Sequence, residues 1–178
     1  MTPLRDSEYD LTHIIVRPLY FGLFSNVLVP MGLLMVIYYL NNRGWHPLVG
    51  DETANLLFYV FAAVALVHVG LVIAWRRKLY ATPMITRQER FELDFTSEYL
   101  RRTRPLFIVI AAVSLYGFIY FFITGRFNES LLFVIFSFLV FQLVRPRYGL
   151  VQKLIDKQQA LVDKGQFRPH DQSDRLQA

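Results

Sequence analysis

The chain has 178 residues, 54% of them hydrophobic, with 16 Phe, 10 Tyr and 2 Trp and a net charge of +5. This apolar content exceeds that of average soluble domains and lies in a few long runs, which excludes an ordinary soluble globule. Most basic residues flank those runs, so the charge indicates membrane orientation and we expect no nucleic-acid partner. The chain has no cysteine, which excludes disulfides, thiolate metal ligands and cysteine nucleophiles.

Four apolar segments approach the roughly 20 helical residues that a bilayer core requires. They are residues 19–40, 54–75, 105–123 and 128–144. The first three contain no Asp, Glu, Lys or Arg. The fourth contains Glu129 and its apolar run begins only at Leu131, so it must include the polar turn before it or thin the bilayer. The sequence predicts an all-α membrane protein whose transmembrane domain, residues 19–145, holds four transmembrane helices arranged as two hairpins.

The basic residues outside these segments predict the orientation in the membrane. The N-terminal segment (1–18) holds two of the 19 Lys and Arg residues, the loop 76–104 holds eight, and the chain after residue 144 holds seven, which leaves Arg43 and Arg126 on the opposite side. Because basic residues are retained in the cytoplasm, we expect both termini and the middle loop to be cytoplasmic. The location predicted is a bacterial inner membrane.

The middle loop, residues 76–104, contains a helical pattern. Thr86 and Glu89 form a capping box, and Phe91, Phe95 and Tyr99 follow at four-residue spacing. This pattern predicts an amphipathic helix whose aromatic face rests on lipid headgroups; the alternative is a solvated loop that only fixes the topology. The basic side chains predicted to bind anionic lipid are Arg76, Arg77, Lys78, Arg101, Arg102 and Arg104.

A second amphipathic helix is predicted over residues 146–165, with Gly165 as its C-terminal stop. Its apolar stripe is aliphatic and its polar face mixes Lys with Asp, unlike a helix that lies on a membrane surface, so we expect it to dock on protein. The partner surface is either the middle loop or a neighbouring subunit. The docking residues expected are Leu150, Leu154, Ile155, Leu161, Phe91 and Phe95. The polar tail, residues 166–178, is predicted to be disordered.

His68 is the only side chain in the predicted spans that titrates near neutral pH. It precedes Trp75 by seven residues, and Asn26 follows Pro18 by eight, so the two lie at nearly equal depth. Pro30 cannot donate to the carbonyl of Asn26, and we expect an interhelical hydrogen bond between His68 and Asn26, its freed carbonyl, or Ser25. The alternative is a haem or quinone bound by His68; a second histidine ligand to the iron would then come from another chain.

Small residues in two of the spans are predicted to mark places where helices approach closely. In the second span they are Ala62, Ala63, Ala65, Gly70 and Ala74, and in the third they are Ala111, Ala112, Ser114 and Gly117.

The function expected from these features is that of a non-catalytic integral membrane subunit. No catalytic or nucleotide-binding motif occurs, and the apolar runs lack the ionisable residues that coupled transporters use. The expected partners are membrane lipids and other membrane subunits or copies of this chain, with no cofactor and no metal. One alternative is an oligomeric channel lined by Asn26, His68, Ser114 and Gln142. A second is an electron-transfer subunit that uses His68 for a haem, quinone or pigment.

Overall fold

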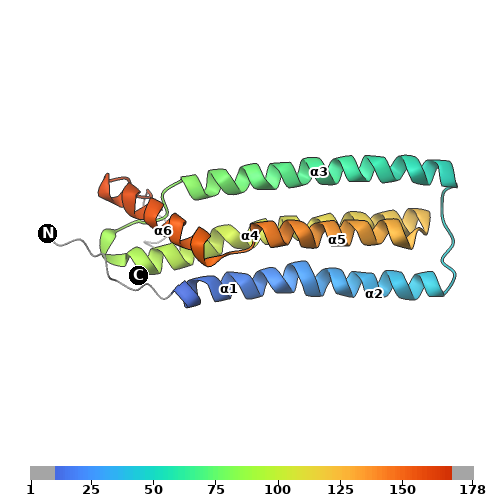
Figure 1. Ribbon diagram of the computed structural model, residues 1–178, viewed down its shortest axis with the longest axis horizontal. Helices are drawn as coiled ribbons and strands as arrows, with labels where there is room; N and C mark the ends of the chain where they lie inside the picture. The colour runs from blue at the N-terminus through green and yellow to red at the C-terminus, as the bar shows by residue number, and fades with distance from the viewer. Residues whose placement is uncertain (1–10, 170–178) are drawn as a thin grey trace.

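A computed structural model describes residues 11–169, which are helical throughout apart from short connections (Figure 1). Four of its helices are long and apolar enough to cross a membrane, as the composition of an integral membrane protein requires. The expectations for residues 1–10 and 170–178, which belong to the predicted N-terminal segment and the predicted tail, lie outside the described residues.

The first membrane helix runs without a break through α1 (Leu11–Leu23), a π-helical turn η1 (Phe24–Leu28) and α2 (Val29–Asn42). The π turn is explained by Pro30, which has no N–H for the carbonyl of Asn26 and whose ring crowds that carbonyl. A wider turn just before the proline relieves this conflict: the N–H of Val29 bonds to the carbonyl of Phe24, five residues back.

The remaining helices are α3 (Asp51–Ala81), the short 3-10 helix η2 (Gln88–Arg90), α4 (Phe91–Thr124), α5 (Phe127–Val144) and α6 (Tyr148–Asp163). With 34 residues, α4 is roughly 51 Å long, so it crosses the membrane and continues well beyond it. It ends at Gly125, whose φ of 68° is the left-handed conformation favoured by glycine. The 18 residues of α5 begin at Phe127, so the fourth span does include the polar turn.

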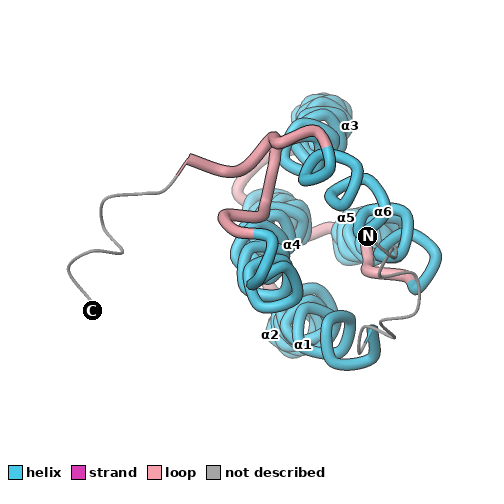
Figure 2. The backbone as a smooth tube through the Cα atoms, turned by 90° about the vertical axis from the view of Figure 1, so that its left-hand side faces the viewer, coloured by secondary structure: helices cyan, strands magenta, loops and turns pink. Residues whose placement is uncertain are grey.

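The antiparallel helices α4 and α5 form the centre of the bundle, with α3 on one side and α1–α2 on the other (Figures 1 and 2). The closest approach in the centre is at Gly117, where a Cβ would lie 2.5 Å from the carbonyl oxygen of Ser130. Ser137 of α5 also donates to the carbonyl of Ile110 at 3.1 Å. On the other side, Gly22 lets α1 lie against Phe107 and Phe141.

The first two membrane helices do not pack as the hairpin that the sequence predicts, since α3 has no extended contact with α1 or α2. The connection between them, residues 43–50, instead crosses the end of α4 (Figure 1). There the N–H of Leu48 donates to the carbonyl of Ile123 at 2.8 Å. The indole N–H of Trp45 donates to the carbonyl of Phe122 at 3.2 Å. The loop therefore satisfies carbonyls at the last turn of α4.

At the opposite end, the first turns of α4 and all of α6 pack together in a region that we call the cap, residues 82–104 with α6. Phe91, Phe95 and Tyr99 are buried there, so the prediction that they rest on lipid headgroups is wrong. They are covered by the apolar stripe of α6 and by Met84 and Ile85 of the linker before α4. Two complementary apolar faces on one chain exclude water more completely than either could at a headgroup surface.

Candidate functional site

Asn26, on the π turn of the first membrane helix, is buried against α4. Its amide nitrogen lies 3.2 Å from the carbonyl oxygen of Phe107 and 3.1 Å from that of Gly22, so it makes an interhelical contact. Its side-chain oxygen has no hydrogen-bond partner within the described part of the chain.

His68, on α3, reaches α4 from the other side. Its Nδ1 lies 2.8 Å from the hydroxyl of Tyr116, and its Nε2 is buried without a hydrogen-bond partner in residues 11–169. The predicted pairing of His68 with Asn26 or Ser25 is therefore wrong. The two side chains do not meet because α4 lies between their helices: Asn26 contacts α4 at Phe107, and His68 contacts it at Tyr116.

A groove of about 590 Å³ runs beside α3, and His68 and Tyr116 form part of its wall. The other residues that line it are apolar: Val64, Val67, Leu71, Val72, Trp75 and Val109. A smaller groove of about 200 Å³ lies on the other side of α3, against Phe133 and Phe136 of α5. The middle of α3 is thus in contact with the bundle along a narrow strip. In the apolar 18-residue stretch of α3, 17% of the residues are buried. In the corresponding stretch of the helix that contains α4, 44% are buried.

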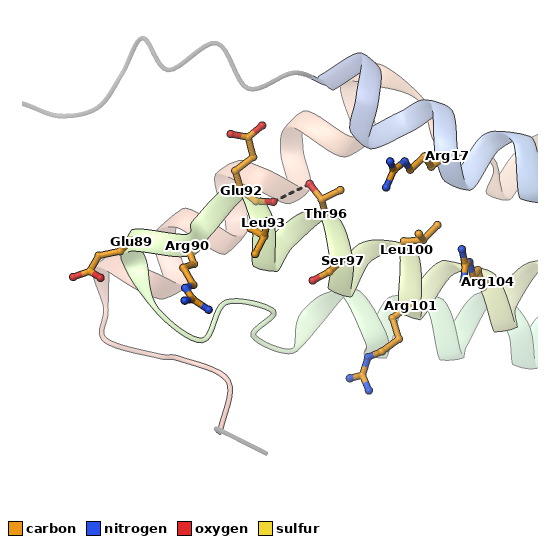
Figure 3. Close-up of a pocket in the computed structure, with 10 residues that line it drawn as sticks. All are labelled: Arg17, Glu89, Arg90, Glu92, Leu93, Thr96, Ser97, Leu100, Arg101 and Arg104. Atoms are coloured by element: carbon orange, nitrogen blue, oxygen red, sulfur yellow. Dashed lines mark hydrogen bonds between the residues drawn. The ribbon is translucent and has the colours of Figure 1, made fainter. Parts of the chain in front are cut away.

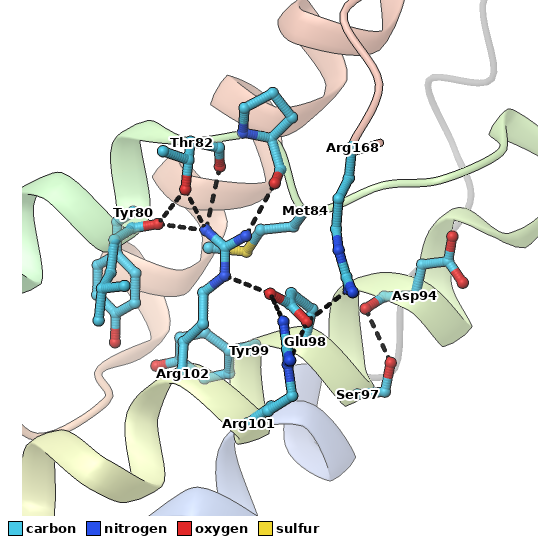
Figure 4. Close-up of polar contacts among 12 residues, drawn as sticks. Tyr80, Thr82, Met84, Asp94, Ser97, Glu98, Tyr99, Arg101, Arg102 and Arg168 are labelled. Atoms are coloured by element: carbon cyan, nitrogen blue, oxygen red, sulfur yellow. Dashed lines mark hydrogen bonds and ion pairs between the residues drawn. The ribbon is translucent and has the colours of Figure 1, made fainter. Parts of the chain in front are cut away.

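Polar contacts hold the two ends of α3. At the loop end, the hydroxyl of Tyr120 donates to the carbonyl of Ala54 at 3.2 Å, and the guanidinium of Arg126 pairs with Asp51 at 2.8 Å. At the cap end, the guanidinium of Arg102 donates to the carbonyls of Leu79, Thr82 and Pro83, where α3 ends and the linker begins (Figure 4).

The carboxylate that fixes Arg102 is Glu98, whose side chain is only 3% exposed. It accepts hydrogen bonds from Arg101 at 2.8 Å, from Arg102 at 2.6 Å and from Arg168 at 2.8 Å (Figure 4). Burial by itself raises the pKa of Glu98, but the bonds from Arg101 and Arg102 and the charges of Arg102 and Arg168 outweigh it and lower that pKa. Glu98 is therefore a structural anion in the cap.

Gln158 of α6 and Arg168 attach α6 and the segment after it to the linker before α4. The side chain of Gln158, fully buried, accepts from the N–H of Met84 at 2.9 Å. The N–H of Arg168 donates to the carbonyl of Ile85 at 2.8 Å. The segment from Gln166 to Arg168, which belongs to the tail predicted to be disordered, is thus held against the linker.

The basic residues predicted to bind anionic lipid separate into different environments. Arg102 has a side chain only 11% exposed and is turned into the cap, so its assignment to lipid is wrong. Arg76 lies over the ring of Tyr80, while Arg77 and Lys78 are exposed at the end of α3. Arg101 contacts Glu98, and Arg104 is exposed near the start of the third span.

The residues predicted to dock a partner through α6 are mostly used within the chain. Leu154 and Ile155 are buried in the cap with Phe91 and Phe95, which is the intramolecular alternative that the sequence left open. Leu150 stays 43% exposed, and Leu161 is half-buried. Because its apolar stripe is covered within the chain, α6 does not present an apolar face for a partner protein.

The other residues considered for a channel or a cofactor do not converge. Ser114 is buried and donates to the carbonyl of Ala111 on its own helix, and Gln142 lies on α5 near Arg147. No three His, Asp or Glu side chains gather as metal ligands within the described range. The groove beside α3 is therefore the membrane-embedded feature in which a titratable group, an unpaired polar atom and open space coincide.

Comparisons with known proteins do not assign a function to the chain. No family model matches the chain, and neither the curated proteins nor the solved structures include a match to it.

Two residues of the candidate site, Glu98 and Tyr116, were not predicted from the sequence. Glu98 could have been found, because Arg101 and Arg102 follow it at the three- and four-residue spacing of helical ion pairs. Tyr116 carries no such signal. It lies inside the third span, seven residues before Ile123, and only the placement of α3 shows that its hydroxyl faces His68.

Proposed function

We propose that the chain is a non-catalytic subunit of a larger assembly in a bacterial inner membrane, and that a helix of another membrane subunit packs along α3. The observation that carries this proposal is the buried Nε2 of His68, which has no partner within the described residues and lies beside a groove. In the hydrocarbon region an unpaired polar group costs free energy that water cannot offset, so a group from outside the chain would stabilise it.

The small residues of α3 mark another exposed face of the same helix, turned by more than about 100° from His68, where a second helix could approach closely. Ala63, Gly70 and Ala74, predicted to mark a close approach of helices, are exposed, and their spacing of seven and four residues places them on one helical face. A Cβ at Gly70 would meet no atom within 4 Å. Small residues let helix backbones approach and so favour association in lipid.

The orientation that we propose places the cap and both termini in the cytoplasm. The distribution of Lys and Arg supports it, because Arg43 and Arg126 alone among the basic residues of the connections lie at the loop end. The chain has no cysteine, so single cysteines can report the topology. A membrane-impermeant maleimide added outside should label a cysteine at Gly50 and leave one at Gln88 unlabelled; the reverse pattern would contradict the orientation.

The experiment that tests the subunit proposal is photo-crosslinking in intact membranes. A photoreactive amino acid at Val67 or Leu71, both exposed on the groove side of α3, should give one discrete protein adduct. The same amino acid at Leu139, exposed on α5, is the matched control and should give lipid adducts only. Equal adducts at α3 and α5, or none at α3, would contradict a specific partner.

The role of His68 is tested in the same assay. Because the imidazole is expected to bond with the partner, His68→Leu should reduce the adduct at Val67 severalfold while His68→Gln retains most of it. The loss should correspond to about 0.6 to 2 kcal/mol, as for other hydrogen bonds in membranes. The unpaired Nε2 also favours the second candidate, a cofactor bound at His68. Haem, pigment or quinone absorption in the gently purified protein, absent from His68→Leu, would support that candidate instead.

A further inference from the structure

A second groove, of about 880 Å³, lies between α1 and the part of α4 that continues beyond the membrane (Figure 3). Arg17 of α1 and Arg104 of α4 stand at one end of it with Leu100 between them, and Glu89 and Arg90 stand at the other (Figure 3). The remaining lining residues are Glu92, Leu93, Thr96, Ser97 and Arg101.

The end that carries Arg17 and Arg104 lies at the boundary between polar and apolar chain. After Arg17 the first membrane helix has no charged residue before Arg43, and after Arg104 the next charged residue is Arg126. The two arginines are therefore the last charges on adjacent helices before the hydrocarbon region. Phosphate groups of the nearer lipid leaflet lie at this depth.

Neither arginine is neutralised within residues 11–169. The ion pairs of the described chain involve Glu98, Asp51 and Glu129 and leave out both Arg17 and Arg104. The guanidinium of Arg104 instead lies 5.7 Å from the centre of the Phe21 ring on α1, which holds its charge at the mouth of the groove. Two cations at one mouth repel each other, and an anion between them would remove that repulsion.

We propose that this groove binds the phosphate of an anionic phospholipid between Arg17 and Arg104. Planar guanidinium groups suit phosphate because they donate paired hydrogen bonds to its oxygens. Glu92 lies twelve residues before Arg104, roughly 18 Å along α4, so the acidic end of the groove is too far away to contact a headgroup whose phosphate lies between the two arginines. The proposed ligand is therefore defined by its phosphate and its net negative charge, and phosphatidylglycerol, which has one phosphate and one negative charge, is the probe.

The test is a titration of the purified, delipidated full-length protein with phosphatidylglycerol, followed by native mass spectrometry. The variant is Arg17→Gln with Arg104→Gln; both side chains are exposed, so the fold should persist, as circular dichroism can verify. Each basic residue near an anionic lipid contributes about fivefold in affinity, and the double variant should bind about 25-fold more weakly. Phosphatidylcholine and inorganic phosphate are titrated in parallel.

The matched control is Arg77→Gln with Lys78→Gln, which removes two charges from the exposed end of α3, where the structure has no part of this groove. Its affinity for phosphatidylglycerol should stay within about twofold of wild type. An equal loss in the control would show diffuse attraction and overturn the site. If phosphatidylcholine binds as tightly as phosphatidylglycerol, the proposed preference for an anionic lipid is wrong. If millimolar inorganic phosphate displaces the lipid, the ligand of the groove is a free anion and not a phospholipid.

Discussion

Along α4 and α5 the contact is continuous, from Gly117 beside Ser130 to the hydrogen bond between Ser137 and Ile110. The helix α3 contacts the bundle differently: polar bonds hold its two ends, and grooves flank its middle. The pair is stabilised by close packing, which tolerates no added volume. The middle of α3 is flanked by open space, so the same substitution should destabilise the central pair and leave α3 nearly unaffected.

The largest effect is expected at Gly117. Gly117→Val places atoms where a Cβ would already lie 2.5 Å from a backbone oxygen, so α4 and α5 must separate. We expect a loss of about 3 kcal/mol in the free energy of unfolding, the upper range for overpacking. Gly70→Val is the matched control and should change stability by less than about 0.5 kcal/mol, because its Cβ meets open space.

Unfolding in mixed detergent micelles, followed by circular dichroism, measures both variants. Similar losses for the two would mean that α3 is packed as tightly as the central pair, and the contrast between the regions would fail.

An intermediate effect is expected at Glu98, which fixes the cap end of α3 through Arg102. Glu98→Gln removes a buried charge that accepts bonds from three arginines, and the loss should be about 2 kcal/mol. Hydrogen exchange should rise at residues 79–85 and remain unchanged in α5. Faster exchange in both regions would indicate that the cap also supports the central pair.

The same residue predicts a dependence on pH. Because the pKa of Glu98 is lowered from its ordinary value of 4.5, its contribution is complete above pH 4.5 and is lost as the pH falls through the lowered pKa of the folded state. The unfolding midpoint of the wild type should therefore fall more steeply below pH 4.5 than that of Glu98→Gln. Parallel profiles would contradict the assignment of the acid sensitivity to Glu98.

The smallest effect concerns the loop end of α3. Tyr120→Phe removes the hydroxyl that donates to the carbonyl of Ala54 and should cost about 1 kcal/mol. Tyr59→Phe is the control, since Tyr59 is 70% exposed on the outer face of α3, and it should have no measurable effect. Loss of the same size in both variants would remove Tyr120 as a specific attachment point.

The membrane helices could be predicted because their signal is local. Runs free of charge are visible in the sequence, and Pro30 marks the irregular turn before it. The arrangement of the helices could not be predicted, because it depends on the loop of residues 43–50 crossing the end of α4. Nothing in the sequence near Trp45 and Leu48 shows that they bond to the carbonyls of Phe122 and Ile123.

The cap shows the same limit for side chains. The spacing of Phe91, Phe95 and Tyr99 correctly indicates an apolar face but does not say what covers it. The stripe of α6 and the aromatic face could each have contacted lipid or protein, and only their proximity in the fold determines that they cover each other. For His68, counting residues pointed to Asn26 as the partner, whereas the choice of Tyr116 depends on the side of α4 on which α3 lies.

The crossing connection of residues 43–50 also constrains how the chain is made. A ribosome delivers the first membrane helix and α3 before α4 and α5, yet the first two helices have no extended contact with each other in the final bundle. Their native positions are set by the helices that come to lie between them, which are made later. During that interval the polar groups of Asn26 and His68 lack the carbonyl and hydroxyl that α4 later supplies. The contacts that hold the first membrane helix and α3 in the bundle therefore form only after α4 is inserted.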